Sequence, residues 1–187
     1  MKNVTNILDL IDLERLQRFQ DVFAKANKVA TVMMDVHGKP ITKPSRYCQL
    51  CRLIRSTDQG LDDCKRHGSN IAKEVLNSGE YTIKICTRTG FADASAPLLI
   101  RGEHIASWAI GQANVQEGAT EEDIRRYAEK ISLDPDELAE AFRDRQHETE
   151  TMTPEQFTHI IEDLLRYSQQ IVTSAEVNYM RILRQLG

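Results

Sequence analysis

The residues with the clearest chemical potential are four cysteines, all of which fall between Tyr47 and Cys86 of the 187-residue chain. They are Cys48, Cys51, Cys64 and Cys86, in the pattern C-x2-C-x12-C-x21-C. Four thiolates can fill a closed tetrahedral site, and zinc is the metal that we expect there. The same thiols would also suit a redox switch, an iron-sulfur cluster or a haem ligand set. Simple core packing is a further alternative, above all for Cys64, which lies on an apolar helix face.

Three predicted elements must bring these cysteines together. Cys48 and Cys51 are three residues apart, so they share one face of a short helix predicted over residues 47–55. Cys64 belongs to a longer helix that ends at Ser78-Gly79. Cys86 closes an alternating strand over residues 81–86. The sequence therefore predicts a site where two helices meet a sheet.

Two further strands are predicted over residues 92–100 and 104–112, and they are rich in small side chains. That pattern leaves room either for tightly packed helices or for a small molecule between helices and sheet. A sole tryptophan and several polar groups lie in the same region. The predicted ligand-binding residues are Trp108, Gln112, Ser95, Asp93 and Arg88.

The rest of the chain completes an α+β pattern. A helix is predicted over residues 5–26 with a break at Asp12, followed by a strand over 29–34, a hairpin turn and a short returning strand over 39–42. After Gly118 the pattern is entirely helical, with three helices that begin at capping residues: Thr120, Asp134 and Thr153. We expect an α+β core over residues 1–118, including the N-terminal helix, and a helical extension over 119–187.

The last predicted helix, from Thr153 to about Leu186, would be roughly 50 Å long at about 1.5 Å per residue. Residues that would form one continuous face of this helix recur at steps of three and four, and we call this face its seam. They are Phe157, Ile161, Leu164, Ser168, Ile171, Ala175, Asn178 and Ile182. We expect its far end to pair with a second copy of the chain as a homodimer, with Asn178 setting the register. The alternative is that the helix folds back on its own core.

Composition excludes several functional classes. The net charge is −4 with mixed signs, so no continuous basic surface for direct nucleic-acid binding is expected. No signal-peptide core and no apolar run of membrane-spanning length occurs, and we expect a cytoplasmic protein with reduced thiols. The five histidines stand apart without a catalytic motif, so an enzyme is not expected.

A series of short motifs runs through about residues 5–115. Besides the segments 7–12 and 34–42, they include Tyr47-Cys48-Gln49-Leu50-Cys51, Gly90-Phe91-Ala92-Asp93, Gly102-Glu103-His104-Ile105 and Gly111-Gln112. Together they resemble the PocR-type sensory domain. In that family Cys51, Cys64 and Cys86 have the clearest counterparts. Relatives often carry Cys-His at the position of Cys86, where this chain continues with Thr87. That leaves open whether Cys48 replaces the histidine or the ligand specificity differs.

The resemblance implies a PAS-like, non-enzymatic module of bacterial signalling, suggested to sense small hydrocarbon derivatives such as diols. It also implies an attached or separate DNA-binding or kinase module as the output partner. The long C-terminal helix would then be the signalling helix.

Overall fold

The computed structural model describes residues 12–100, 102–115 and 118–186, and the side chains at position 100 and from position 175 onward lie outside that description. The helices are α1 (Leu13–Asn27), α2 (Gln49–Ile54), α3 (Asp58–Ser78), α4 (Glu121–Lys130), α5 (Pro135–Glu148) and α6 (Pro154–Leu186). The strands are β1 (Ala30–Asp35), β2 (Thr82–Ile85), β3 (Ala92–Ile100) and β4 (Glu103–Ala113). The predicted α+β, PAS-like architecture is confirmed.

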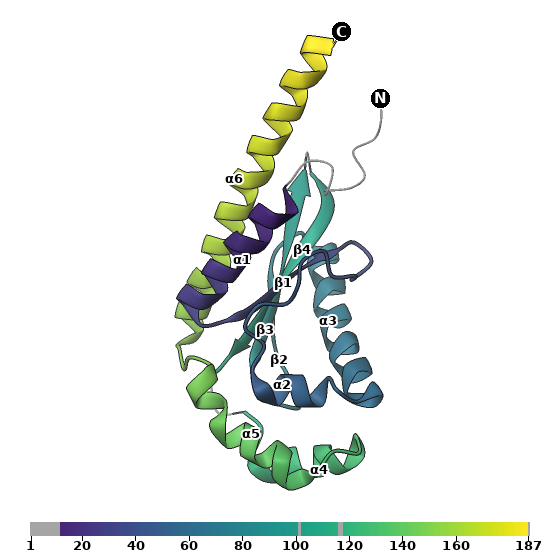
Figure 1. Cartoon of the computed structure of the whole chain (residues 1–187), viewed down its shortest axis with the longest axis vertical. Helices are drawn as coiled ribbons and strands as arrows, with labels where there is room; N and C mark the ends of the chain where they lie inside the picture. The colour runs from purple at the N-terminus through teal and green to yellow at the C-terminus, as the bar shows by residue number, and fades with distance from the viewer. Residues whose placement is uncertain (1–11, 101, 116–117, 187) are drawn as a thin grey trace.

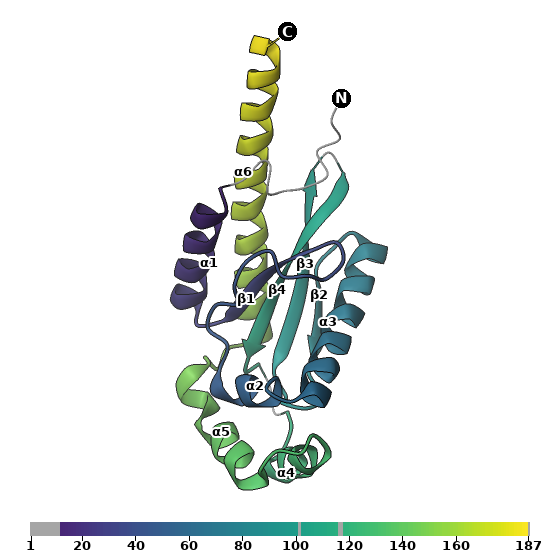
Figure 2. The ribbon, with the colours of Figure 1, turned by 45° about the vertical axis from the view of Figure 1, so that its right-hand side comes forward.

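The four strands form one open antiparallel sheet in the order β1-β4-β3-β2. Helices α1 and α6 cover one face of this sheet, and α3 covers the other (Figure 1). Figure 2 shows the same layers and places α2, α4 and α5 at one end of the sheet. The end of the sheet beside α2 is therefore enclosed by three helices.

Most element boundaries follow from local capping chemistry. The Asp12 side chain accepts hydrogen bonds from the backbone N–H groups of Glu14 and Arg15 at the start of α1. Thr120 and Asp123 form a reciprocal capping box at α4. Gly79 ends α3 with a φ of +73°, a left-handed conformation that favours glycine. The predicted helix starts at Thr120, Asp134 and Thr153 are confirmed.

Pro97 lies in β3 beyond the last residue that pairs with β2, which is Ser95. This segment of β3 is a local edge, as the sequence predicted for a residue without an N–H. The predicted strand over residues 39–42 is reduced to an isolated bridge between Met34 and Pro40, because the chain turns away to bring Ser45 beside Thr31. The predicted residues 5–11 of the first helix lie outside the described part of the chain.

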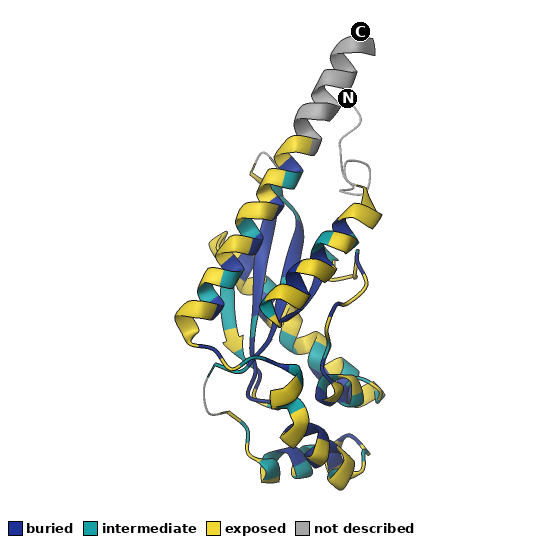
Figure 3. Cartoon of the chain, turned by 60° about the vertical axis from the view of Figure 1, so that its left-hand side comes forward, coloured by how far each residue is buried: buried dark blue, intermediate teal, exposed yellow. Residues whose placement is uncertain are grey.

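Two hydrophobic cores hold the layers together. The larger lies between the sheet and α1 and α6, and its side chains include Phe23, Trp108 and Ile161. The smaller lies between α2 and the α4–α5 hairpin, and it includes Ile54 and Phe142. Figure 3 shows buried residues concentrated on the sheet and on the helix faces turned toward it. Because α2 comes before residue 118 and α4–α5 after it, the smaller core joins both predicted parts of the chain.

Helix α6 has 33 residues, and its first half packs on β3. Phe157, Ile161 and Leu164 are at most 1% exposed, and Val172 is equally buried although the predicted seam places Ile171 there. The C-terminal half projects beyond the sheet (Figure 1). The side chains of Ala175, Asn178 and Ile182 fall outside the description, so pairing with a second copy stays a prediction.

In the part of the chain that the structure describes, none of the helices combines the length and the apolarity needed to cross a membrane.

Candidate functional site

The cysteines lie at the end of the sheet that α2, α4 and α5 enclose. Cys48 is the residue that precedes α2, and its backbone N–H donates a hydrogen bond of 2.8 Å to Oε1 of Gln112 at the end of β4. Cys51 follows one turn later, Cys64 lies on α3, and Cys86 follows β2. Cys48 and Cys86 are buried, and Cys51 and Cys64 are partly exposed.

Cys48 and Cys51 interact with each other directly. A hydrogen bond from the Cys51 side chain is the main cause that lowers the pKa of the Cys48 thiol. The same contact raises the pKa of the Cys51 thiol well above its ordinary value, together with burial and the charges of Cys48, Asp93 and Cys86. Of the two thiols, Cys48 is therefore the one that loses its proton more readily.

Cys64 and Cys86 both interact electrostatically with Arg88. Burial raises the pKa of Cys64, the charge of Arg88 opposes that rise, and Cys86 and Asp93 add to it. Among the described residues, Nε of Arg88 is buried without a hydrogen-bond partner. These mutual effects mean that Cys51, Cys64, Cys86 and Asp93 occupy one electrostatic neighbourhood.

The tightest group of metal-binding atoms combines three residue types. Among the described residues, His67, Cys86 and Asp93 are the group whose donor atoms all lie within 4.8 Å of one another. Nε2 of His67 lies 3.1 Å from Oδ2 of Asp93. The four cysteine sulfurs converge on the same region without meeting this mutual distance, so a four-thiolate site stays a prediction.

A β-bulge fixes the carboxylate of Asp93. The register between β3 and β4 shifts between Ala92 and Ala94, which leaves both Gly111 and Gln112 opposite Asp93. Gln112 has a φ of +57°, and its backbone N–H donates a 3.0 Å hydrogen bond to Oδ1 of Asp93. Oδ1 is thus anchored while Oδ2 points to His67. Gln112, a predicted ligand-binding residue, positions both Asp93 and Cys48.

Helix α4 is tied to α3 beside the site. The Tyr127 hydroxyl donates a 3.0 Å hydrogen bond to Oδ2 of the buried Asp63. Burial by itself would raise the pKa of Asp63, but this hydrogen bond and the charges of Lys130 and Arg66 lower it. Burial and the bond to Asp63 raise the pKa of Tyr127. The contact holds the α4–α5 hairpin over the cysteines.

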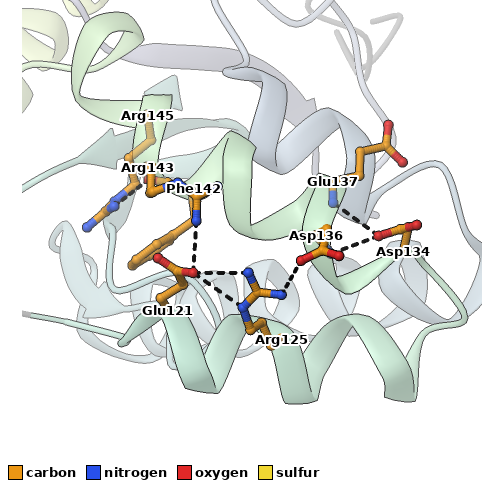
Figure 4. A network of polar contacts seen from close by, with 8 residues as sticks. All are labelled: Glu121, Arg125, Asp134, Asp136, Glu137, Phe142, Arg143 and Arg145. Carbon is orange, nitrogen blue, oxygen red and sulfur yellow. Dashed lines mark hydrogen bonds and ion pairs between the residues drawn. The ribbon is translucent and has the colours of Figure 1, made fainter.

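The hairpin itself is held by a network of charges (Figure 4). Arg125 lies between Glu121 and Asp136, at 3.2 and 2.6 Å, and so connects α4 with the start of α5. Arg143 of α5 pairs with the same Glu121 at 2.8 Å. These groups are largely exposed, so each pair contributes little alone. Because Glu121 pairs with both Arg125 and Arg143, the network connects α4 with α5 at more than one point.

The predicted ligand-binding residues divide between the two faces of the sheet. Asp93 and Ser95 belong to the β3 face that α3 covers, since Asp93 contacts His67. Trp108 belongs to the opposite face, where it is 0% exposed and its ring meets Phe19 edge-on at 6.4 Å between centroids. Its indole N–H is buried and has no partner among the described residues. Trp108 therefore cannot contact the same bound ligand as Ser95 and Asp93 on the α3 side of the sheet.

Comparison with known proteins identifies the family to which this chain belongs. The model of a family described as the sensory domain found in PocR matches residues 9–176. The chain belongs to the PocR sensory-domain family. The Regulatory protein PocR of Salmonella typhimurium is 26% identical over 133 residues, which are 71% of this chain and 43% of that protein. The chain thus matches less than half the length of this relative, and no solved structure matches it significantly.

Within this PocR sensory domain, His67 was missed as a site residue by the reasoning from sequence. Its signal was present, because His67 follows Cys64 by three residues on a helix and so shares its face. Asp93 was predicted to contact the ligand, and the structure gives it a partner in His67.

Proposed function

We propose that this chain is a non-enzymatic, cytoplasmic sensor that binds a small hydroxylated organic molecule and holds a metal ion at its cysteine cluster. The observation that carries the proposal is that α2, α3, β3 and the β2–β3 turn bring thiol, imidazole and carboxylate groups to one enclosed end of the sheet. Zinc is the metal that fits such mixed sulfur, nitrogen and oxygen donors. When bound, it would tie the helical donors of this cluster to the sheet.

The ligand is expected between α3 and the sheet. Ile71 and Val75 of α3 are buried there, and the strand face they cover carries small or hydroxylated side chains, among them Ser95, Ser107 and Ala109. An apolar wall with a few hydroxyl groups suits a short diol or alcohol. The site adjoins Asp93, so ligand and metal would act on the same strand.

Strand β3 links this region to the output helix. One face of β3 carries Asp93 and Ser95, while Ala94 and Ala96 on the other face belong to the core that α6 completes. Nε2 of Gln169 on α6 also donates a 3.1 Å hydrogen bond to the carbonyl of Leu99. A ligand that favours one position of β3 would bias α6, and a ligand indifferent to that position would transmit nothing.

The proposed output is a change in the pairing of α6 with a second copy, read by a DNA-binding or kinase module. The Salmonella relative is a regulatory protein whose length extends well beyond the match, which supports an output module of this kind.

Thermal unfolding with and without propane-1,2-diol, short alcohols and small acids tests ligand binding. At 100 times its Kd a ligand adds about 2.7 kcal/mol of stability, or roughly 5–10 °C in Tm for a domain of this size. We expect Ser95→Ala to reduce the shift and Trp108→Phe to preserve it. A shift lost only in Trp108→Phe would move the ligand to the α1–α6 face, and no shift with any compound would contradict ligand binding.

A redox sensor is the second candidate, and the contact between Cys48 and Cys51 favours it. Peroxide would oxidise the two thiols to one disulfide while it is reduced to two molecules of water. After peroxide treatment, thiol titration of the native chain should find two fewer free thiols, and a reductant should restore both. In Cys48→Ser this reversible loss of two thiols should not occur. Red or brown protein after anaerobic purification would instead indicate haem or an iron-sulfur cluster.

A further inference from the structure

The donor group at the enclosed end of the sheet differs in kind from four thiolates. It contains one sulfur, one imidazole nitrogen and one carboxylate oxygen, from Cys86, His67 and Asp93, all within 4.8 Å of one another. From these contacts we infer that the metal is held by Cys86, His67 and Asp93, with a fourth coordination position open to water or to a hydroxyl oxygen. This inference rests on the proposed metal site and specifies its ligands.

The backbone presets all three donors. The turn after Cys86 is closed by two hydrogen bonds, in which Cys86 N–H donates to the Phe91 carbonyl at 2.7 Å and Gly90 N–H donates to the Cys86 carbonyl at 2.8 Å. The β-bulge anchors Oδ1 of Asp93 to Gln112, so that Oδ2 faces His67. His67 is in the interior of the 21-residue helix α3. Little reorganisation would be needed when the ion binds.

Charge and access also favour this set. The Cys86 thiolate and the Asp93 carboxylate would balance a divalent cation, whereas four thiolates would leave excess negative charge in a mostly buried place. The side chains of His67 and Asp93 are 19% and 28% exposed, so an ion can reach them from solvent. Cys48 is 1% exposed, and its interaction is with Cys51.

A zinc site with three protein ligands differs from a closed structural site, in which four protein ligands fill every position. A tetrahedral zinc ion with three residues keeps a fourth position for water or another oxygen donor. Because Asp93 lies on the strand face proposed to contact the organic ligand, a ligand oxygen could take that position. The metal could then contact the hydroxyl group of the sensed molecule directly, in addition to fixing the fold.

Titration of the 187-residue chain with Co²⁺ followed by competition with Zn²⁺ tests the ligand set. The sulfur-to-cobalt absorption band grows with each coordinated thiolate, so the native chain should show the intensity of one thiolate. We expect His67→Asn and Cys86→Ser to weaken binding by at least about 10–100-fold. Cys48→Ser is the matched control and should bind as the native chain does, with circular dichroism checking that each variant is folded.

Each outcome decides between the alternatives. Binding that survives His67→Asn but is lost in Cys48→Ser, or a band of four-thiolate intensity, would overturn this ligand set and leave a cysteine-ligated metal in place. A native chain that binds neither ion would overturn both this inference and the metal part of the proposed function. The thermal-shift test would still decide separately whether an organic ligand binds. Because the native spectrum is informative alone, a variant that fails to fold does not remove the test.

Discussion

Gly111→Ala should disrupt the site without removing any donor group. A Cβ at Gly111 would lie 2.1 Å from Oδ1 of Asp93 and 2.9 Å from its Cα, so both the side chain and the backbone of β3 must move. Overpacking of this kind costs about 1–3 kcal/mol. Loss of the hydrogen bond from Gln112 to Asp93 would add about 1 kcal/mol. We therefore expect a loss of about 2–4 kcal/mol in the free energy of unfolding, measured in urea, together with weaker binding of Zn²⁺.

Gly68→Ala is the matched control. A Cβ at Gly68 meets nothing within 4 Å, and the residue lies inside α3 next to His67. Alanine should stabilise the helix by roughly 0.5–1 kcal/mol and leave zinc affinity unchanged. If Gly111→Ala unfolded within about 0.5 kcal/mol of the native chain and bound zinc equally well, the described contact between the bulge and Asp93 would be refuted.

Three other outcomes are expected. Tyr127→Phe should cost about 1–2 kcal/mol at pH 7. The pKa of Asp63 is lowered in the fold, so the stability that its hydrogen bond with Tyr127 adds is present above the ordinary carboxyl pKa of about 4 and is lost as the pH falls through the folded pKa. Urea unfolding of the native chain and of Tyr127→Phe should therefore show a smaller difference at pH 3.5 than at pH 7. An equal difference at both pH values would contradict this role of Asp63. Leu164→Ala should lower the free energy of unfolding by about 2–5 kcal/mol, whereas Gln170→Ala on the exposed face of α6 should change it by no more than about 0.5 kcal/mol. Similar values for the two variants would show that α6 does not pack as described. Sedimentation should give a two-chain mass for residues 1–187 and a one-chain mass after truncation at Thr173, and a monomer in both cases would contradict pairing through α6.

Local rules were enough for most of the elements. Capping residues such as Thr120 and Asp134 act within a few positions of sequence, so the helix starts could be read directly. The alternation in β3 and β4 predicted the central hairpin for the same reason. The short segment around Pro40 was harder, because its pairing depends on β1 and on the position of Ser45 rather than on its own pattern.

The site was only partly accessible from sequence, because its geometry depends on contacts between distant elements. The cysteine spacing indicated the correct region. It could not show that Asp93 faces His67, since that contact depends on how α3 packs against β3. Trp108 was grouped with residues of the opposite sheet face, because only the pairing of Trp108 with Ala96 shows which residues share its face. Burial of the first half of α6 on its own sheet likewise depends on the small residues of β3.

X-ray absorption at the zinc edge of the purified 187-residue chain tests the proposed metal site most directly. We expect about one zinc per chain with mixed ligands, in which one sulfur at about 2.3 Å accompanies nitrogen and oxygen ligands at about 2.0–2.2 Å. A shell of four sulfurs would contradict the ligand set of Cys86, His67 and Asp93. Protein without bound metal, even after incubation with zinc, would contradict the metal site altogether.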